Sequence, residues 1–400
     1  MADASPPPHL TTFQIFLRFL RFGMLAWGGP VAQIAMIRRD LVEEERWVSS
    51  GRFNRLLAIY QVLPGPEAHE LCVHLGMLAG KRRGGVAAGL GFMIPGFLLM
   101  LGLSWLYFQL DLTRSALGAV FLGVQVGVLA LVVRAVHRIG SHILLNKWLW
   151  AIGLASTIAA FSGTEFWLIL PAAGLTYMLA ARHLYRAAIA SAAVAALAGI
   201  LLATTSFSSE LATAPPELIS PGGVSALTLF ACGLKAGLLT FGGAYTAIPF
   251  LRDDAVGRGW MTDAQFLDGV ALSGMLPAPL IIFSTFVGFC AGGLIGALAM
   301  TAGIFLPAFG FSLLFFDRLE RVVQNVKLHH FLEGVTAGVI GLIVATMIEL
   351  GWALTERVPD LVAAMLIFAA ALALLYTWKS QLNIVAAVLA SGALGYVTMN

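Results

Sequence analysis

Long apolar runs constrain this chain more than any other feature. Gly85–Tyr107 and Leu361–Tyr376 contain no charged residue, and runs approaching 20 such residues match the thickness of a bilayer. Only 11% of the 400 residues are charged and 59% are hydrophobic, whereas a soluble domain carries about 25% charged residues. We therefore predict an all-α, polytopic membrane protein.

The N-terminal stretch, the cysteines and the net charge exclude several other features of the protein. The N-terminal stretch MADASPPPHLTT lacks a basic region and a cleavage site, so we expect the first apolar segment to remain in the protein. Cys72, Cys232 and Cys290 lie in apolar segments and read as buried thiols. The net charge of +3 predicts no nucleic-acid partner, and we expect no cofactor and no metal.

The stretch HELCVH, from His69 to His74, resembles the zinc motif H-E-x-x-H but has the wrong spacing. In that motif the two histidines lie roughly 40° apart around a helix, whereas a five-residue spacing separates them by about 140°. One metal ion therefore cannot bind both from a continuous helix. A membrane-embedded enzyme stays the alternative from another class, although the chain also lacks a G-x-S-x-G motif.

The two halves of the chain repeat each other at an offset of 214 residues. Rare residues recur in both halves: the pairs are Gly23/Gly237, Gly28/Gly242, Gly29/Gly243, Ile34/Ile248, Arg38/Arg252, Asp40/Asp254 and Val42/Val256. After a one-residue deletion, Trp47 aligns with Trp260, and LPGP (Leu63–Pro66) aligns with LPAP (Leu276–Pro279). Such matches indicate an internal duplication.

Each half divides into six apolar segments. They span roughly 14–30, 56–79, 86–109, 115–136, 147–162 and 164–181, then 225–243, 266–290, 293–316, 332–352, 359–378 and 382–399. One further segment, about 185–204, links the halves and makes the second half enter the membrane from the opposite side. We predict a disordered tail (1–12), a first repeat (13–182), a linker helix with an outside loop (183–223) and an inverted second repeat (224–400).

The distribution of basic residues predicts a cytoplasmic N-terminus and an outside C-terminus. Lys81, Arg82 and Arg83, with later basic clusters including Arg252 and Arg258, then fall inside, and the 205–223 loop contains no Lys or Arg. The 31–55 stretch is the exception, because it would lie outside and yet carries five arginines. Either this stretch dips back, or some of its arginines serve an anion.

Proline and glycine interrupt the apolar segments at matching places in the two halves. Proline removes a backbone donor and disfavours helix at the preceding residue. An unwound turn in lipid is tolerated only where it lines a cavity or is buried in protein. We predict four breaks that meet near the bilayer midplane around a pseudo-two-fold axis, where exposed N–H groups and positive helix ends suit an oxyanion.

The predicted substrate-binding residues follow from these breaks and from two membrane cations at equivalent positions, Arg21 and Lys235. They are Arg21, Gly28, Gly29, Pro30, Gln61, Pro64, Gly65, Pro66 and Glu67 in the first half, and Lys235, Gly242, Gly243, Pro277 and Pro279 in the second.

Structural interpretations of these residues stay open. A PGP sequence can be a plain kink, and Glu67 can simply cap a helix. Gln61, His69 and Glu70 could line the path of a substrate, but Gly274, Ile282 and Phe283 occupy the equivalent places. Those three polar groups are therefore not expected in a symmetric site.

At these residues the chain resembles the chromate ion transporter family in its long two-domain form. The most specific pieces are FGMLAWGGPVAQIAMI (22–37), QVLPGPEAHELCVHLGMLAGKRRGG (61–85) and FGGAYTAIPFL (241–251), and the resemblance runs from about Phe13 to Val397. It implies a multi-pass protein of the bacterial inner membrane that exports chromate and confers chromate resistance. Sulfate or another small oxyanion is the alternative substrate, and a homodimer is left open.

Overall fold

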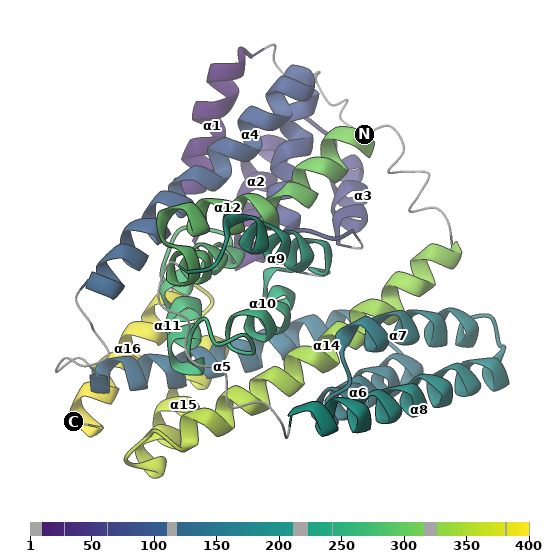
Figure 1. Ribbon diagram of the computed structural model, residues 1–400. Coiled ribbons are helices and arrows are strands. Elements are labelled where there is room, and N and C mark those ends of the chain that lie inside the picture. Colours follow the sequence, from purple (N-terminus) through teal and green to yellow (C-terminus); the bar gives the residue numbers. More distant parts are fainter. Residues whose placement is uncertain are drawn as a thin grey trace. The chain divides into compact units, whose positions relative to one another are not determined.

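The computed structural model describes residues 10–27, 29–61, 63–109, 118–210, 223–241, 243–315, 326–380 and 382–399 (Figure 1). All regular structure in these ranges is helical, which confirms the predicted all-α class. Four helical stretches in the same ranges are long and apolar enough to cross a bilayer: Glu67–Gln109, Gly118–Ile143, Leu280–Leu314 and Leu328–Thr355. The chain is a polytopic helical membrane protein. The predicted tail falls almost entirely outside the described residues, as does most of the 205–223 loop.

The helices follow the predicted apolar segments, with breaks inside several of them. The first half contains α1 (Thr12–Met24), α2 (Gly29–Arg38), the π-helical turn η1 (Arg39–Glu44), α3 (Ser50–Tyr60), α4 (Glu67–Gln109), α5 (Gly118–Ile143), α6 (Lys147–Phe161) and α7 (Phe166–Ala180). The predicted linker is α8 (Tyr185–Glu210). The second half contains α9 (Ala226–Leu238), η2 (Ala244–Ala247), α10 (Ile248–Ala255), α11 (Asp263–Gly274), η3 (Leu280–Ile282), α12 (Phe283–Phe315), α14 (Val326–Thr355), α15 (Leu361–Thr377) and α16 (Asn383–Thr398).

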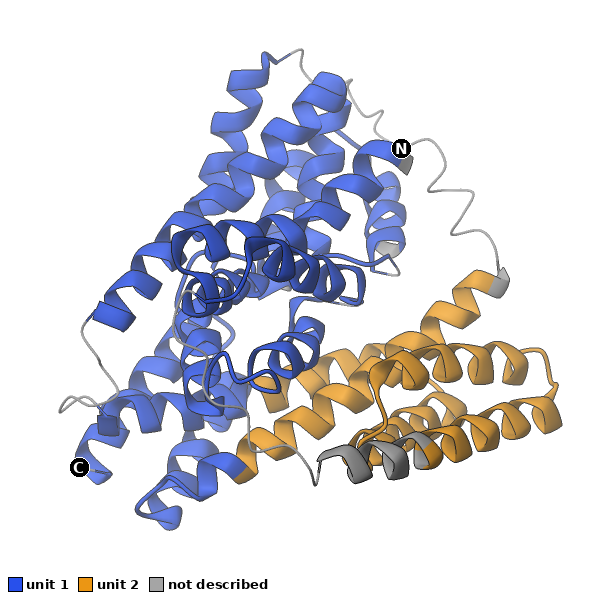
Figure 2. Cartoon of the chain, in the orientation of Figure 1, with its two compact units in different colours: residues 1–131, 219–317, 353–400 blue, residues 132–218, 318–352 orange. Residues whose placement is uncertain are grey.

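Contacts divide the chain into two compact units (Figure 2). Unit 1 comprises residues 1–131, 219–317 and 353–400, and unit 2 comprises residues 132–218 and 318–352. Unit 2 is held by an apolar core that includes Leu149, Ile152 and Ile340, and by the Thr157 hydroxyl, which donates to the Gly341 carbonyl over 3.0 Å. Unit 1 takes its helices from both predicted repeats, and the boundaries of those repeats stay a prediction.

Within unit 1, each half contains the same backbone reversal. Gly80 (φ −146°, ψ 24°) and Lys81 (φ 54°, ψ −154°) interrupt α4, and Gly292 (φ −141°, ψ 17°) and Gly293 (φ 60°, ψ −150°) interrupt α12. Each long helix is therefore a helical hairpin with two limbs. The two limbs come close together at glycines. A Cβ atom added to Gly76 in one limb would lie only 2.5 Å from the carbonyl oxygen of Gly84 in the other.

The first helix of each half packs on its hairpin in the same way, α1 on α4 and α9 on α12 (Figure 1). A Cβ on Gly23 would lie 2.5 Å from the Phe92 carbonyl oxygen, and a Cβ on the equivalent Gly237 would lie 2.4 Å from that of Ile304. Only glycine permits backbones to approach so closely. The matching of rare residues between the halves thus has a counterpart in matching geometry.

The two hairpins lie against each other in opposite directions. Near the reversal of α4, a Cβ on Gly85 would lie 3.0 Å from the Leu313 side chain, at the far end of α12. At the other end of α4, the Phe108 ring stacks on that of Phe289, three residues before the reversal of α12, with centroids 5.9 Å apart. The reversals therefore lie at opposite ends of the pair.

The polar stretch between α2 and α3 returns toward the start of the chain. Glu45 forms an ion pair with Arg18, and the Trp47 ring lies 6.5 Å from that of Phe19, so both contact the middle of α1. In the second half, the Cys290 thiol contacts the carbonyl oxygen of Trp260 over 3.5 Å, two residues before the reversal. Helices of 10 and 11 residues, such as α2 and α3, span only about 15–17 Å, which is half of a hydrocarbon core. These contacts favour the first of the two open interpretations, in which the 31–55 stretch dips back.

Unit 1 also contains a buried hydrogen-bond network around the Asp268 carboxylate, which no sequence motif indicates. The Tyr107 hydroxyl donates to Oδ2 of Asp268 over 2.6 Å, and Nε2 of Gln125 donates to Oδ1 over 2.7 Å. Arg357 in turn donates to Oε1 of Gln125. The network joins α4, α5 and α11 and gives the buried Asp268 two donors.

We expect the polar stretch and the first reversal to lie on one side of the membrane. Single cysteines at Glu44 and Arg82 should react with an impermeant maleimide from the same side. If the equivalent stretch of the second half also dips back, a cysteine at Arg258 should react from the opposite side, which differs from the inside position that the basic residues alone predict. The natural cysteines are buried, so background labelling should be low. Labelling of Glu44 and Arg82 from opposite sides would show that α2 or α3 crosses the bilayer.

Tyr107→Phe should destabilise the protein by about 1–3 kcal/mol, because it leaves an oxygen of buried Asp268 without a donor. Thermal unfolding in detergent would measure the loss. Tyr396→Phe is the control, since the Tyr396 side chain is half exposed and should unfold like the parent. Equal stabilities of the two variants would mean that the network contributes nothing to folding.

Candidate functional site

All four predicted breaks interrupt helices. They lie between α1 and α2, between α9 and η2, between α3 and α4, and between α11 and η3. Three of them hold a glycine with positive φ: Gly29 at 78°, Gly65 at 141° and Gly243 at 124°. Gly28 and Gly242 lie outside the described residues. The glycines allow the backbone to turn where an L side chain would be strained.

Breaks from the two halves contact each other in unit 1. The Gly65 amide donates to the Thr240 carbonyl oxygen over 2.8 Å, which links the LPGP break to the residues before Gly243. A Cβ on Gly96 of α4 would lie 2.4 Å from the Cβ of Ala278 in the LPAP break. We call Gly65, Thr240, Gly96 and Ala278 the break junction. The junction gives the unwound backbone a protein partner, which it needs in the absence of water.

A second set of contacts gathers near the start of α16. Cβ atoms on Gly29 and on Gly274 would lie 4.0 and 3.6 Å from the Ile384 side chain. Tyr245, just after Gly243, packs against the apolar cluster that contains Ile384. Three of the four breaks therefore contribute to one neighbourhood on α16.

Exposure separates the predicted site residues into two groups. Gln61 is exposed, and Gly29, Pro30 and Pro64 are partly exposed, so a ligand could reach them. The buried members are Gly65, Pro66, Glu67, Gly243, Pro277 and Pro279. The buried group shapes the backbone, and the partly exposed group is where contact with a substrate is feasible.

Charge distinguishes the helix starts at the breaks. The first turn of α4 carries Glu67 and Glu70, and a negative charge on Glu67, the first residue of the helix, offsets its positive end. The first turns of α2 and α12 carry no acidic residue. The second residue of α12, Ser284, is fully buried, and its hydroxyl has no hydrogen-bond partner among the described residues. An oxyanion is therefore better accommodated at α2 and α12 than at α4.

Arg21 and Lys235, although equivalent in the repeat, lie in different surroundings. Arg21 is exposed on α1. Nζ of Lys235 lies 2.7 Å from a carboxylate oxygen of Asp254, which also pairs with Arg258 over 2.9 Å. Lys235 and Arg258 line a surface hollow of about 360 Å³. The recurrence of Asp40 and Asp254 in both halves was the sequence signal for such a partner.

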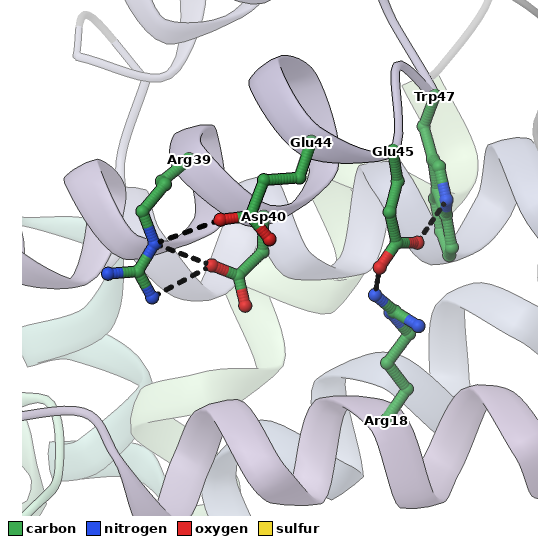
Figure 3. A network of polar contacts seen from close by, with 6 residues as sticks. All are labelled: Arg18, Arg39, Asp40, Glu44, Glu45 and Trp47. Atoms are coloured by element: carbon green, nitrogen blue, oxygen red, sulfur yellow. Dashed lines mark hydrogen bonds and ion pairs between the residues drawn. The ribbon is translucent and has the colours of Figure 1, made fainter.

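Arginines of the 31–55 stretch also have acidic partners (Figure 3). Nη2 of Arg39 lies 3.0 Å from Asp40, and Nε lies 3.7 Å from Glu44. Arg18 pairs with Glu45, which also accepts from the Trp47 indole over 2.9 Å. Arg39 is thus neutralised locally, which leaves it less suited to holding a substrate anion.

Comparison with known proteins places the chain in a family. Residues 13–220 and 227–396 match the model of the chromate transporter family. A chromate transport protein of Pseudomonas aeruginosa is 62% identical over 396 residues, which cover 99% of this chain and 94% of the relative. A chromate transport protein of Cupriavidus metallidurans is 31% identical over 399 residues, covering 97% and 94%.

A shorter relative matches part of the chain. An uncharacterised transporter of Bacillus subtilis is 29% identical over 162 residues, which cover 81% of that protein but only 40% of this chain. No solved structure matches the chain. With most of its length matched by one family model and 99% of it by a relative that is 62% identical, the chain belongs to the chromate transporter family.

Proposed function

We propose that this protein is a secondary-active transporter that exports chromate across the bacterial inner membrane and so confers chromate resistance. The observation that carries the proposal is the break junction, where broken helices of the two halves meet through the Gly65–Thr240 hydrogen bond. Helices interrupted at corresponding places of two halves are typical of binding sites in secondary transporters. The names of the relatives from Pseudomonas and Cupriavidus support chromate as the substrate.

The opposed hairpins α4 and α12 support an inverted repeat. With their reversals at opposite ends, the two halves would present equivalent surfaces to the two sides of the membrane. Rocking of one half against the other would then open the break junction alternately to each side. If the first two apolar segments of each half both re-enter, each half keeps an even number of crossings, and the single linker α8 still inverts the second half.

Energetics favour export. Moving one charge across 100 mV yields about 2.3 kcal/mol, so a dianion gains about 4.6 kcal/mol on leaving a negative cytoplasm. This corresponds to a concentration ratio of roughly 2,000. Sulfate uptake would run against this gradient and would need cotransported cations.

Labelled chromate uptake into inverted vesicles at imposed potentials tests the proposal. We expect saturable uptake that grows when the vesicle interior is made positive, and counterflow that a passive channel would not show. Excess sulfate should compete weakly. Uptake of labelled sulfate with no chromate uptake would overturn the choice of substrate.

We expect Arg21→Gln and Lys235→Gln each to reduce chromate transport about tenfold or more, which is about 1.4 kcal/mol. The reason is that each variant removes a cation that would attract the dianion to its half, which for Lys235 requires that its ion pair with Asp254 opens during transport. Lys235→Gln leaves Asp254 paired with Arg258, so insertion should be retained. Arg21→Lys and Lys235→Arg are the matched controls and should keep most of the activity. Full chromate resistance in both glutamine variants would remove these residues from the site.

Regularising the breaks should harm transport more than insertion. Pro64→Ala with Pro66→Ala, and separately Pro277→Ala with Pro279→Ala, restore backbone donors and favour continuous helix over the free N–H groups. Transport per inserted molecule should fall by similar factors in the two double variants, since the site draws on both halves. Membrane yield is measured alongside. Low yield combined with normal transport per molecule would indicate kinks with a packing role only.

A further inference from the structure

Glu70 is a buried carboxyl group in contact with the break junction. Its side chain is fully buried, and neither carboxylate oxygen has a hydrogen-bond partner among the described residues. A Cβ built on Gly65 would lie 2.8 Å from Oε1 of Glu70. The carboxyl group therefore rests directly on the residue whose amide joins the two halves.

The groups around Glu70 do not compensate a negative charge. The titratable and polar residues that contact this place are Tyr60 of α3, Glu67, His69 and His74 of α4, and Ser312 of α12. The exposed Arg52 of α3 acts electrostatically on His74, whereas Glu67 is the charged group that acts on Glu70. The Tyr60 hydroxyl is hydrogen-bonded to Nδ1 of His74 over 2.7 Å and accepts a hydrogen bond from Ser312.

Two further neighbours on α4 give no compensation either. His69 lies between the rings of Phe305 and Phe309, and its Nε2 donates to the Gly89 carbonyl oxygen. Glu67 is also acidic and would repel a negative charge on Glu70. An ionised carboxylate left in such surroundings is very costly, so Glu70 holds a proton in this conformation.

The fold does not need a carboxyl group at this position. The repeat-equivalent residue is Phe283, which follows the LPAP break, is fully buried and packs edge-on against Phe266 with centroids 5.6 Å apart. The same place after the same kind of break is thus filled by an aromatic ring. An ionisable group buried in a membrane protein without a packing reason points to a role in transport.

We propose that Glu70 is the proton-carrying site of the transporter, and this proposal rests on the proposed function. The step is the loss and recovery of one O–H bond: Glu70 releases its proton to water on the cytoplasmic side and regains one from the outside. Deprotonation places an uncompensated charge against Gly65 and so favours opening of the break junction to water. One proton would enter for each chromate exported.

The experiment uses the full-length protein in liposomes and compares the parent with Glu70→Gln. Exchange of labelled chromate at equal concentrations on both sides requires no net proton movement. Net chromate flux driven by a pH gradient does require net proton movement. It is measured with the membrane potential clamped at zero by potassium and valinomycin. A pH-sensitive dye reports protons moved by a chromate gradient.

We expect the parent protein to perform all three activities. Glu70→Gln should keep chromate exchange within about twofold and lose pH-driven flux and chromate-driven proton movement by about tenfold or more. Its melting temperature should match that of the parent, because a neutral amide replaces a neutral acid. Proton coupling equal to that of the parent, loss of exchange, or a clear fall in melting temperature would each overturn the proposal.

Two comparisons distinguish a failure of the role proposed for Glu70 from a failure of the proposed function. Asp268→Asn is the matched control, because Asp268 is equally buried but accepts from Tyr107 and Gln125. This variant should lose stability and keep proton coupling in the molecules that insert. A parent protein that exchanges chromate but moves no protons refutes the role of Glu70 alone, whereas a parent that exchanges no chromate refutes the proposed function itself.

Discussion

The need to satisfy unwound backbone in a bilayer underlies the organisation of unit 1. A helix that stops inside lipid leaves donors and acceptors that no solvent can satisfy. Here the LPGP break of the first half finds its acceptor at Thr240, beside a break of the second half. Each half therefore completes the other, and the close glycine packing of α1 and α9 on their hairpins holds the breaks in place.

Electrostatics in this unit are mostly local. Arg18, Arg39, Lys235 and Arg252 each lie within ion-pair distance of an acidic side chain. These pairs lower the net charge that the cations present. An anionic substrate of the proposed transporter would therefore meet cations that are largely compensated. Its recognition would then depend on backbone N–H groups and on the few cations that become available when the halves move.

Much of this structure could be read from the sequence, and the reasons for the rest are physical. Proline and paired glycines leave a direct signature, so all four breaks could be located, and rare residues such as Trp47 and Trp260 indicated a duplication. Hydropathy records how apolar a segment is but does not record where it turns. The sequence therefore leaves two interpretations of the 31–55 stretch open, and it is the contacts of Glu45 and Trp47 that favour its return. Long-range partners, such as Thr240 for Gly65 and Asp268 for Tyr107, carry no local signal at all.

The short helices that lead to the breaks would affect how the proposed transport responds to the membrane potential. At 13 residues, α1 and α9 are each about 20 Å long, which is less than the roughly 30 Å hydrocarbon core. If these helices stand along the bilayer normal and water reaches their ends at the breaks, only a thin low-dielectric layer separates the two aqueous phases. The membrane field is then concentrated over a few ångströms around the break junction. A bound dianion would cross most of the potential drop in one small displacement, so the conformational step itself would be electrogenic.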